Sequence, residues 1–133
     1  MYKVTRYIEF CYGHRLLNYS GKCRHLHGHN AKAEIELYAE ELDALGMVRD
    51  FEVIKKVVQV WIDENLDHKM ILCENDPLIP TLKDLEESHY IIDINPTAEA
   101  IAKLIYDFAC SRKLPVSEVR LWETPKSYAT YRR

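Results

Sequence analysis

The sequence predicts an α+β fold with the element order ββααββ, in which two helices pack on one face of an antiparallel sheet. Residues 2–12 are rich in aromatic and β-branched types, and residues 29–39 alternate small or apolar with charged side chains, so both segments are expected to be strands. Two later segments carry apolar residues at helical spacing. The 133 residues correspond to one domain, spanning 1–133.

The remaining elements follow in order along the chain. Gly46 lies in a turn, and Asp50 is the expected N-cap of a helix that continues to about residue 65. Residues 67–95 contain two prolines, an acidic patch and a short strand-like YIID, which together indicate mostly a long connection. Asn95-Pro96 is the expected start of the second helix, with the cap residue followed by proline at the first helical position. VSEVRLWETP and SYATYRR are expected to form a strand pair.

The overall composition excludes several classes of protein. A formal net charge of -3 does not favour nucleic-acid binding, which needs a basic stripe. No apolar run is long enough for a signal peptide or a membrane span, which favours a cytoplasmic location. The four cysteines include no CxxC pair and are expected to be thiols rather than a disulfide framework. Cys11 and Cys110 are expected to be packed in the interior.

The stretch CRHLHGHN, residues 23–30, carries the strongest chemical signal. If the second strand begins near residue 27, His27 and His29 point to the same face, because side chains at i and i+2 do so on a strand. His14 lies at the end of the first strand, which is the natural hairpin partner, and supplies a third ligand. Three histidines leave one tetrahedral position open, which is typical of a catalytic zinc site.

Cys23 permits two interpretations. It can be a fourth ligand that closes a structural zinc site. It can instead be a nucleophile or base, because a thiol close to a dication and to Lys22 and Arg24 should have a lowered pKa. Spacing alone does not choose between these two.

Two further features concern carboxylates. Asp67 and His68 are adjacent directly after the first helix, which is either an accidental neighbourhood or an acid–base pair. Glu123 lies in an apolar strand, where an unpaired charge is costly, so it requires a donor-rich partner such as an arginine or a ligand.

Taken together, six segments resemble the 6-pyruvoyl-tetrahydropterin synthase superfamily, and are most similar to its 6-carboxy-tetrahydropterin synthase branch. The short interval between Cys23 and the HGH motif also resembles that branch. The resemblance spans nearly the whole chain in family order. The matching segments are FCYGHRL (10–16), CRHLHGHN (23–30), GMVRDF (46–51), LDHK (66–69), NPTAE (95–99) and WET (122–124).

The resemblance implies roles for individual residues. It implies that His14, His27 and His29 bind zinc. Cys23 becomes the general base, and Asp67 and His68 complete the acid–base set. Glu123 becomes the anchor for the pterin's N–H donors, and Thr97 and Glu99 line the same pocket.

The resemblance also implies an activity and an assembly. The expected fold is the tunnelling fold, in which subunits of a trimer or hexamer close a barrel and share their active sites. The expected reaction converts 7,8-dihydroneopterin triphosphate to 6-carboxy-5,6,7,8-tetrahydropterin, acetaldehyde and triphosphate, an early step of queuosine biosynthesis. The alternatives are a 6-pyruvoyl-tetrahydropterin synthase and a non-catalytic structural zinc module. The chain departs from the family pattern at residues 70–73, after LDHK.

Overall fold

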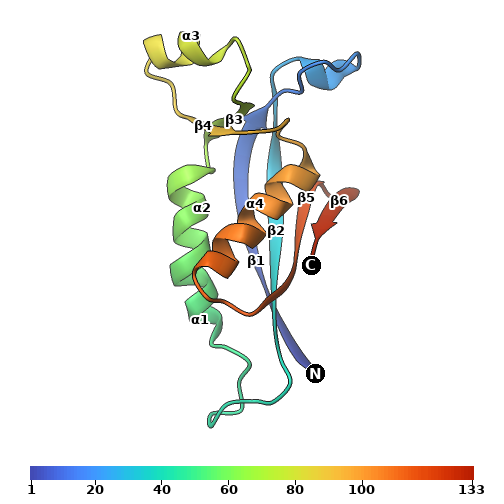
Figure 1. Cartoon of the computed structure of the whole chain (residues 1–133), viewed down its shortest axis with the longest axis vertical. Coiled ribbons are helices and arrows are strands. Elements are labelled where there is room, and N and C mark those ends of the chain that lie inside the picture. Colours follow the sequence, from blue (N-terminus) through green and yellow to red (C-terminus); the bar gives the residue numbers. More distant parts are fainter.

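The computed structural model describes residues 1–133 and shows a curled, mixed six-stranded sheet with helices (Figure 1). The strands lie in the order β4-β3-β1-β2-β5-β6. Their bounds are β1 (Tyr2–His14), β2 (His27–Ala39), β3 (Lys69–Cys73), β4 (His89–Ile92), β5 (Val116–Thr124) and β6 (Ser127–Tyr131). The α-helices are α1 (Phe51–Ile54), α2 (Val60–Asn65), α3 (Ile79–Asp84) and α4 (Ala98–Ser111).

The first two strands form a long antiparallel hairpin at the centre of the sheet. Pairing is continuous from Tyr2 opposite Ala39 to His14 opposite His27. Both predicted strands are therefore confirmed, and β2 does begin at residue 27. Because the register has no bulge, side chains alternate strictly between the two faces along the whole hairpin.

The hydrophobic core lies on one face of this sheet, under the helices. α1 and α2 belong to one helical segment, joined by the π-helical stretch η2 (Lys55–Gln59), and α4 packs beside them. Asp50 caps this segment as predicted, since its carboxylate accepts a hydrogen bond from the amide of Glu52. The fully buried side chains come from both helical segments and from the strands, and include Ile8, Ile35, Leu37, Ile54, Ile62, Ile101, Ile105 and Leu121.

The expectation of a long connection at 67–95 was wrong. This region contains β3, α3 and β4, and β3 pairs in parallel with both β1 and β4. The sheet is therefore mixed rather than antiparallel, and the element order is ββαβαβαββ with a third helix. β3 is only 5 residues long and has its apolar residues consecutively, at 70 to 73, so it lacks the alternation that marks a strand in the sequence.

The expected start of the second helix was also wrong, by two residues. The N-cap is Thr97, whose hydroxyl accepts a hydrogen bond from the amide of Ala100. Pro96 precedes the cap, and Asn95 uses its side-chain amide elsewhere, in a pair of hydrogen bonds to the backbone of Leu17. Asparagine and threonine both cap helices well, so the choice between them depended on this tertiary contact.

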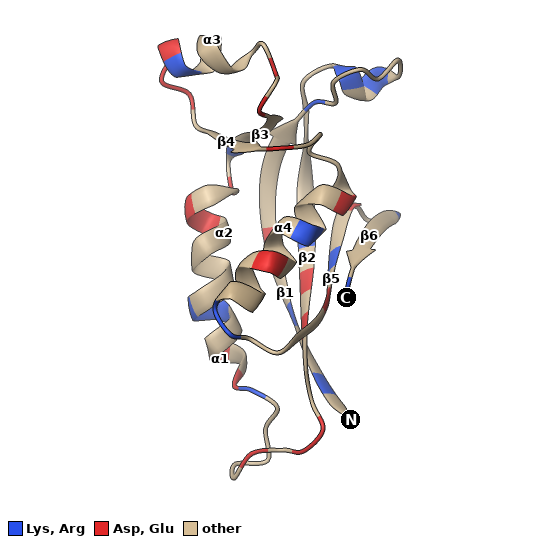
Figure 2. Ribbon diagram, in the orientation of Figure 1, with Lys and Arg blue, Asp and Glu red and all other residues tan.

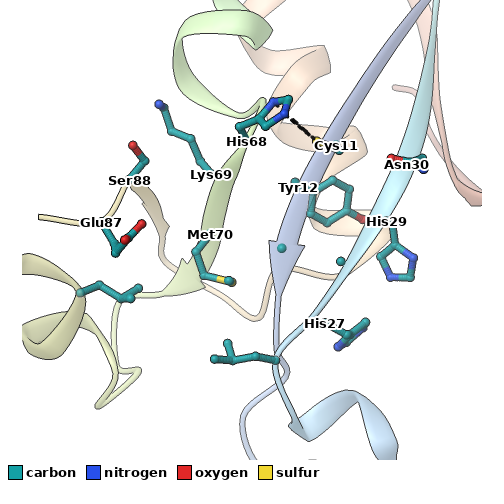
Figure 3. Close-up of a pocket in the computed structure, with 14 residues that line it drawn as sticks. Cys11, Tyr12, His27, His29, Asn30, His68, Lys69, Met70, Glu87 and Ser88 are labelled. Atoms are coloured by element: carbon teal, nitrogen blue, oxygen red, sulfur yellow. Dashed lines mark hydrogen bonds between the residues drawn. The ribbon is translucent and has the colours of Figure 1, made fainter. Parts of the chain in front are cut away.

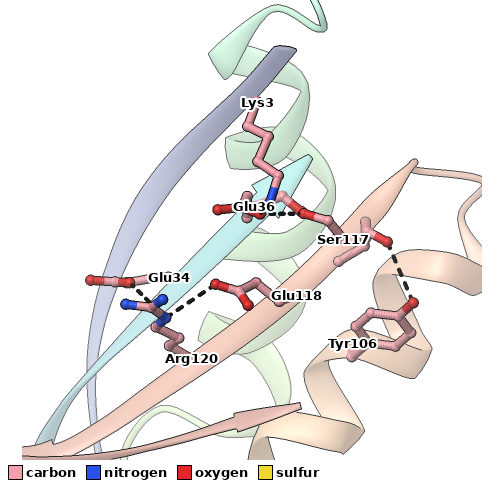
Figure 4. Close-up of polar contacts among 8 residues, drawn as sticks. Lys3, Glu34, Glu36, Tyr106, Ser117, Glu118 and Arg120 are labelled. Atoms are coloured by element: carbon pink, nitrogen blue, oxygen red, sulfur yellow. Dashed lines mark hydrogen bonds and ion pairs between the residues drawn. The ribbon is translucent and has the colours of Figure 1, made fainter. Parts of the chain in front are cut away.

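The opposite face of the hairpin and β5 is polar and carries no helix. Arg120 contacts Glu118 and Glu34, and Ser117 donates to Glu36, which also pairs with Lys3 (Figure 4). Acidic and basic residues are interspersed over the molecule rather than gathered in one stripe (Figure 2). None of the helices has the length and apolar character needed to cross a membrane.

The capping role of Thr97 can be tested by substitution. Thr97→Ala removes the acceptor for the Ala100 amide and should lower the free energy of unfolding by about 1 kcal/mol. Thr97→Ser keeps the hydroxyl and should retain most of that stability. Thermal denaturation of the three proteins at one protein concentration measures the difference. Equal destabilisation by serine and alanine would contradict the capping role.

Candidate metal centre and active site

Three imidazoles converge at the end of the β1–β2 hairpin. His14 and His27 are directly opposite in the register, and His29, two residues further along β2, faces the same side. Their ligand nitrogens lie within 4.8 Å of one another. The predicted group of His14, His27 and His29 is thus brought together by strand alternation and by the hairpin register.

Hydrogen bonds at the Nδ1 atoms of His14 and His27 leave the Nε2 atom of each ring free to face a common centre. The Nδ1 of His14 lies 2.6 Å from the carbonyl oxygen of Pro96, and the Nδ1 of His27 lies 2.7 Å from that of His25. Carbonyls accept hydrogen bonds, so each Nδ1 carries the proton and each Nε2 presents a lone pair. A backbone carbonyl that accepts the other ring N–H and so fixes the tautomer is usual for metal-binding histidines.

The free nitrogens fit a metal ion. The Nε2 atoms of His14 and His29 are 3.2 Å apart, and a tetrahedral zinc with bonds of 2.0–2.1 Å requires about 3.3 Å. The Nε2 of His27 is buried without any hydrogen-bond partner, which is costly for a polar atom unless it binds a ligand. Burial lowers the pKa of His14 and outweighs the hydrogen bond to Pro96 and the charge of Glu123, which raise it, so the neutral, metal-binding form is favoured.

Glu123 lies beside this cluster. Its carboxylate accepts a hydrogen bond from the hydroxyl of Tyr12 at 3.0 Å and lies 3.9 Å and 3.8 Å from the Nε2 atoms of His14 and His29. Burial, the charge of Glu123 and this hydrogen bond together raise the pKa of Tyr12, so the phenol remains a donor. Arg120 does not pair with Glu123. The two are three residues apart on β5, and side chains an odd number of residues apart on a strand face opposite sides of the sheet.

The segment that follows His14 is held by an ion pair and by hydrogen bonds that the sequence did not predict. Arg15 forms a bidentate ion pair with Asp76, whose side chain is fully buried. The side-chain amide of Asn95 both accepts from the amide and donates to the carbonyl of Leu17. These contacts tie the β3–α3 loop and the start of α4 to the histidine cluster. In the sequence, these contacts are indicated only by the polar side chains of Arg15, Asp76 and Asn95 in segments between regular elements.

Cys23 lies in the loop between β1 and β2, in the short 3-10 helix η1 (Lys22–Arg24). The carbonyl of Cys23 accepts a hydrogen bond from the amide of Leu16, which keeps this loop close to the hairpin. Its thiol is half-buried and does not belong to the group of converging ligand atoms formed by the three histidines. This arrangement favours the open site over the closed structural one.

Asp67 and His68 form a real pair. The Nδ1 of His68 lies 2.9 Å from the carboxylate of Asp67, and the other carboxylate oxygen accepts the backbone amide of Cys11. Burial raises the pKa of Asp67, but the hydrogen bonds from Cys11 and His68 outweigh this effect and hold the pKa below its usual range. The sulfur of Cys11 lies 3.5 Å from the His68 ring nitrogens, so this thiol is not the packed interior residue that the sequence predicted.

The pair does not face the histidine cluster within one chain. His68 contacts Cys11, whereas Tyr12 and His14 point to the other side of β1. Figure 3 shows the His68 ring directed at Cys11, away from the rings of His27 and His29. A cavity of about 710 Å³ adjoins both groups, lined in part by Cys11, Tyr12, Gly13, His27, His29, His68 and Met70.

The remaining two predicted residues lie at the start of α4. Thr97 uses its hydroxyl as the helix cap, and Glu99 is exposed in the first turn. Neither lines the 710 Å³ cavity of this chain. Both residues closely follow Pro96, whose carbonyl contacts His14, so the start of α4 lies next to the histidine cluster.

The curled sheet with its hairpin of converging histidines defines an α+β protein with a candidate metal centre. The sequence pattern described as 6-pyruvoyl tetrahydropterin synthase matches residues 3–133. The chain belongs to this family.

Relatives with known names narrow the resemblance further. The chain is 41% identical to the 6-carboxy-5,6,7,8-tetrahydropterin synthase of Rickettsia bellii, over 96% of this chain and 98% of that protein. It is 32% identical to the protein of the same name from Haemophilus influenzae, over 98% and 99% of the two chains.

Solved structures agree on the fold. A crystal structure of an uncharacterised protein from Wolinella succinogenes has a TM-score of 0.83 at 31% identity and covers 99% of this chain and 98% of its own. The 6-pyruvoyl tetrahydropterin synthase of Caenorhabditis elegans has a TM-score of 0.73 at 24% identity, covering 99% and 95%, and supports the fold alone.

The metal centre can be tested by removing one ligand. His27→Ala should leave two imidazoles and lose most of the bound metal, because two ligands hold zinc poorly. His25→Ala is the matched control, since His25 contributes its backbone carbonyl rather than its ring to the cluster. Metal analysis of purified protein, with about one ion per chain expected in the control, measures the effect. Full metal retention in His27→Ala would exclude the site as described.

Proposed function

We propose that this protein is a zinc-dependent carbon–carbon lyase that converts 7,8-dihydroneopterin triphosphate and one water to 6-carboxy-5,6,7,8-tetrahydropterin, with release of acetaldehyde and triphosphate. The observation that carries the proposal is the set of three imidazoles whose Nε2 atoms converge, with the Nε2 of His27 buried and unpartnered. The relatives named 6-carboxy-5,6,7,8-tetrahydropterin synthase, at up to 41% identity over nearly the full length, support this product.

The histidine cluster would hold the metal and orient the substrate side chain. Zinc bound there would supply Lewis acidity for the side-chain oxygens of the substrate. His14 and His27 are held by the carbonyls of Pro96 and His25, which set the orientation of both rings in advance. The open fourth position is what separates this arrangement from a structural zinc site.

Glu123 would anchor the pterin ring. Tyr12 donates to one carboxylate oxygen, which leaves lone pairs of the carboxylate for the amino and ring N–H donors of a pterin. An ionised carboxylate makes charge-assisted hydrogen bonds, roughly twice as strong as neutral ones. Thr97 and Glu99 would form part of the same pocket, and of the two only Glu99 has no helix-capping contact.

Proton transfer would involve Cys23 and the Asp67–His68 pair. Cys23 as thiolate would remove a proton from the substrate side chain. His68, held by Asp67 through its Nδ1, would carry protons at its other nitrogen. Lys22 and Arg24 flank Cys23 and are exposed, so they are candidates for the triphosphate.

The site would be completed between subunits of a trimer or hexamer. The sheet has two unpaired edge strands, β4 and β6, and barrel closure by neighbouring copies would pair them. Asp67 and His68 face away from the histidine cluster of their own chain, which fits a pair that serves the cluster of a neighbour. In this scheme the enzyme is cytoplasmic and catalyses an early step of queuosine and 7-deazapurine biosynthesis.

Product analysis tests the reaction. Zinc-loaded protein incubated with dihydroneopterin triphosphate should yield acetaldehyde and triphosphate in equal amounts, and Cys23→Ala should keep the zinc but lower kcat by about 10²–10⁴-fold. Triphosphate without acetaldehyde would instead indicate a 6-pyruvoyl-tetrahydropterin synthase. No turnover by the zinc-loaded wild type, or loss of zinc from Cys23→Ala, would favour the structural zinc module.

Mixing two inactive variants tests the shared site. Cys23→Ala and His68→Ala subunits, exchanged in equal amounts, should regain activity at about one quarter of the sites, where an intact thiol meets an intact pair from a neighbour. Native mass spectrometry of tagged subunits establishes that exchange has occurred. Continued inactivity after proven exchange would place each complete site within one chain.

A further inference from the structure

The group formed by Cys11, Asp67 and His68 has a property that the proposed reaction does not require. Each residue offers one ligand atom, and the three atoms lie within 4.8 Å of one another. The cluster is separate from the three histidines. Strand alternation places Cys11 on one side of β1 and His14 on the other. We propose that it is a second cation site, selective for a soft divalent ion such as Zn²⁺.

The distances agree with metal coordination. The sulfur of Cys11 lies 3.5 Å from the ring nitrogens of His68. A tetrahedral ion with a Zn–S bond of about 2.3 Å and a Zn–N bond of about 2.0–2.1 Å separates its two ligand atoms by about 3.6 Å. Thiolate, imidazole and carboxylate together suit zinc, cobalt or cadmium, whereas magnesium and calcium prefer oxygen ligands alone.

The cluster is held in place by backbone hydrogen bonds. The amide of Cys11 donates to Asp67 at 3.0 Å, and the amide of His68 donates to the carbonyl of Cys11 at 2.7 Å. His68 has a left-handed backbone, with φ of 58°, which is uncommon for a residue other than glycine and is often found at functional sites. These contacts fix the Asp67 carboxylate and the backbone of Cys11 and His68 relative to one another before any ion binds.

An ion can reach the cluster. The side chain of His68 is 79% exposed, so its imidazole can turn to present a lone pair without loss of packing. Cys11 and His68 line both the 710 Å³ cavity and a second cavity of about 760 Å³, in which Asp67 also takes part. Asp67 is ionised at neutral pH, and the Cys11 thiol would release its proton to solvent when the ion binds.

Occupation of this site would have a consequence for catalysis. The ion would bind the imidazole of His68 that the proposed reaction uses for proton transfer, so zinc in excess of one ion per chain should inhibit turnover. This consequence rests on the proposed function. Binding of the ion does not, because it depends only on the geometry of the three ligands.

The test is a cobalt titration of full-length protein already loaded with one zinc per chain. Co²⁺ bound at the second site should produce a thiolate-to-cobalt charge-transfer band in the near ultraviolet, which histidine ligands alone cannot produce. Cys11→Ser should abolish the band and weaken binding of the second ion by more than about 10–100-fold. Removal of a residue that only supports a ligand already costs that much affinity, and Cys11 is a ligand itself. Asp67→Asn should weaken it with the thiol still present.

Two variants serve as controls. Cys110→Ser makes the same change on α4, away from the cluster, and should leave the band unchanged. Cys23→Ser should also retain it. The proposal is overturned if wild-type protein shows no charge-transfer band at saturating Co²⁺, if the band persists in Cys11→Ser, or if it disappears in Cys23→Ser. Retention of the first zinc by each variant shows that the fold is intact, whatever the outcome for turnover.

Discussion

The unbroken register of the β1–β2 hairpin is the constraint on which the rest of the structure depends. Pairing of His14 with His27 places two imidazoles side by side, and the two-residue period of a strand adds His29 on the same face. A shift of one residue on β2 would turn His27 and His29 to the opposite face and also expose the apolar residues that pack under the helices. The hydrophobic core therefore fixes the geometry of the metal centre.

The second layer of organisation comes from loops that hold the cluster from outside. Pro96 accepts the Nδ1 proton of His14, and its neighbour Asn95 is hydrogen-bonded to the backbone just beyond that histidine. Arg15, the next residue after His14, is paired with the buried Asp76. Removing one partner of an ion pair with a fully buried side chain strongly destabilises a protein, because the other charge is left unpaired. These residues therefore hold the histidine ligands in place.

The two faces of β1 separate two kinds of chemistry. Tyr12 and His14 belong to the face with Glu123 and the histidine cluster, whereas Cys11 belongs to the face with Asp67 and His68. A single chain thus carries a candidate metal site and an Asp67–His68 pair that do not meet. This separation accounts for both proposals: the pair can serve a neighbouring subunit, and it can bind an ion of its own.

The sequence by itself determined the features that depend on local periodicity. Alternation located the hairpin and the histidine triad, and helical spacing located the helix that begins after Asp50. The tertiary structure alone decided the strand β3 and the parallel pairing of β4, whose strand-like YIID the sequence did indicate, because consecutive apolar residues do not distinguish a strand from other buried segments. It also decided the cap at Thr97 and the contact of Cys11 with His68, 57 residues apart, because both depend on which distant segments the fold brings together.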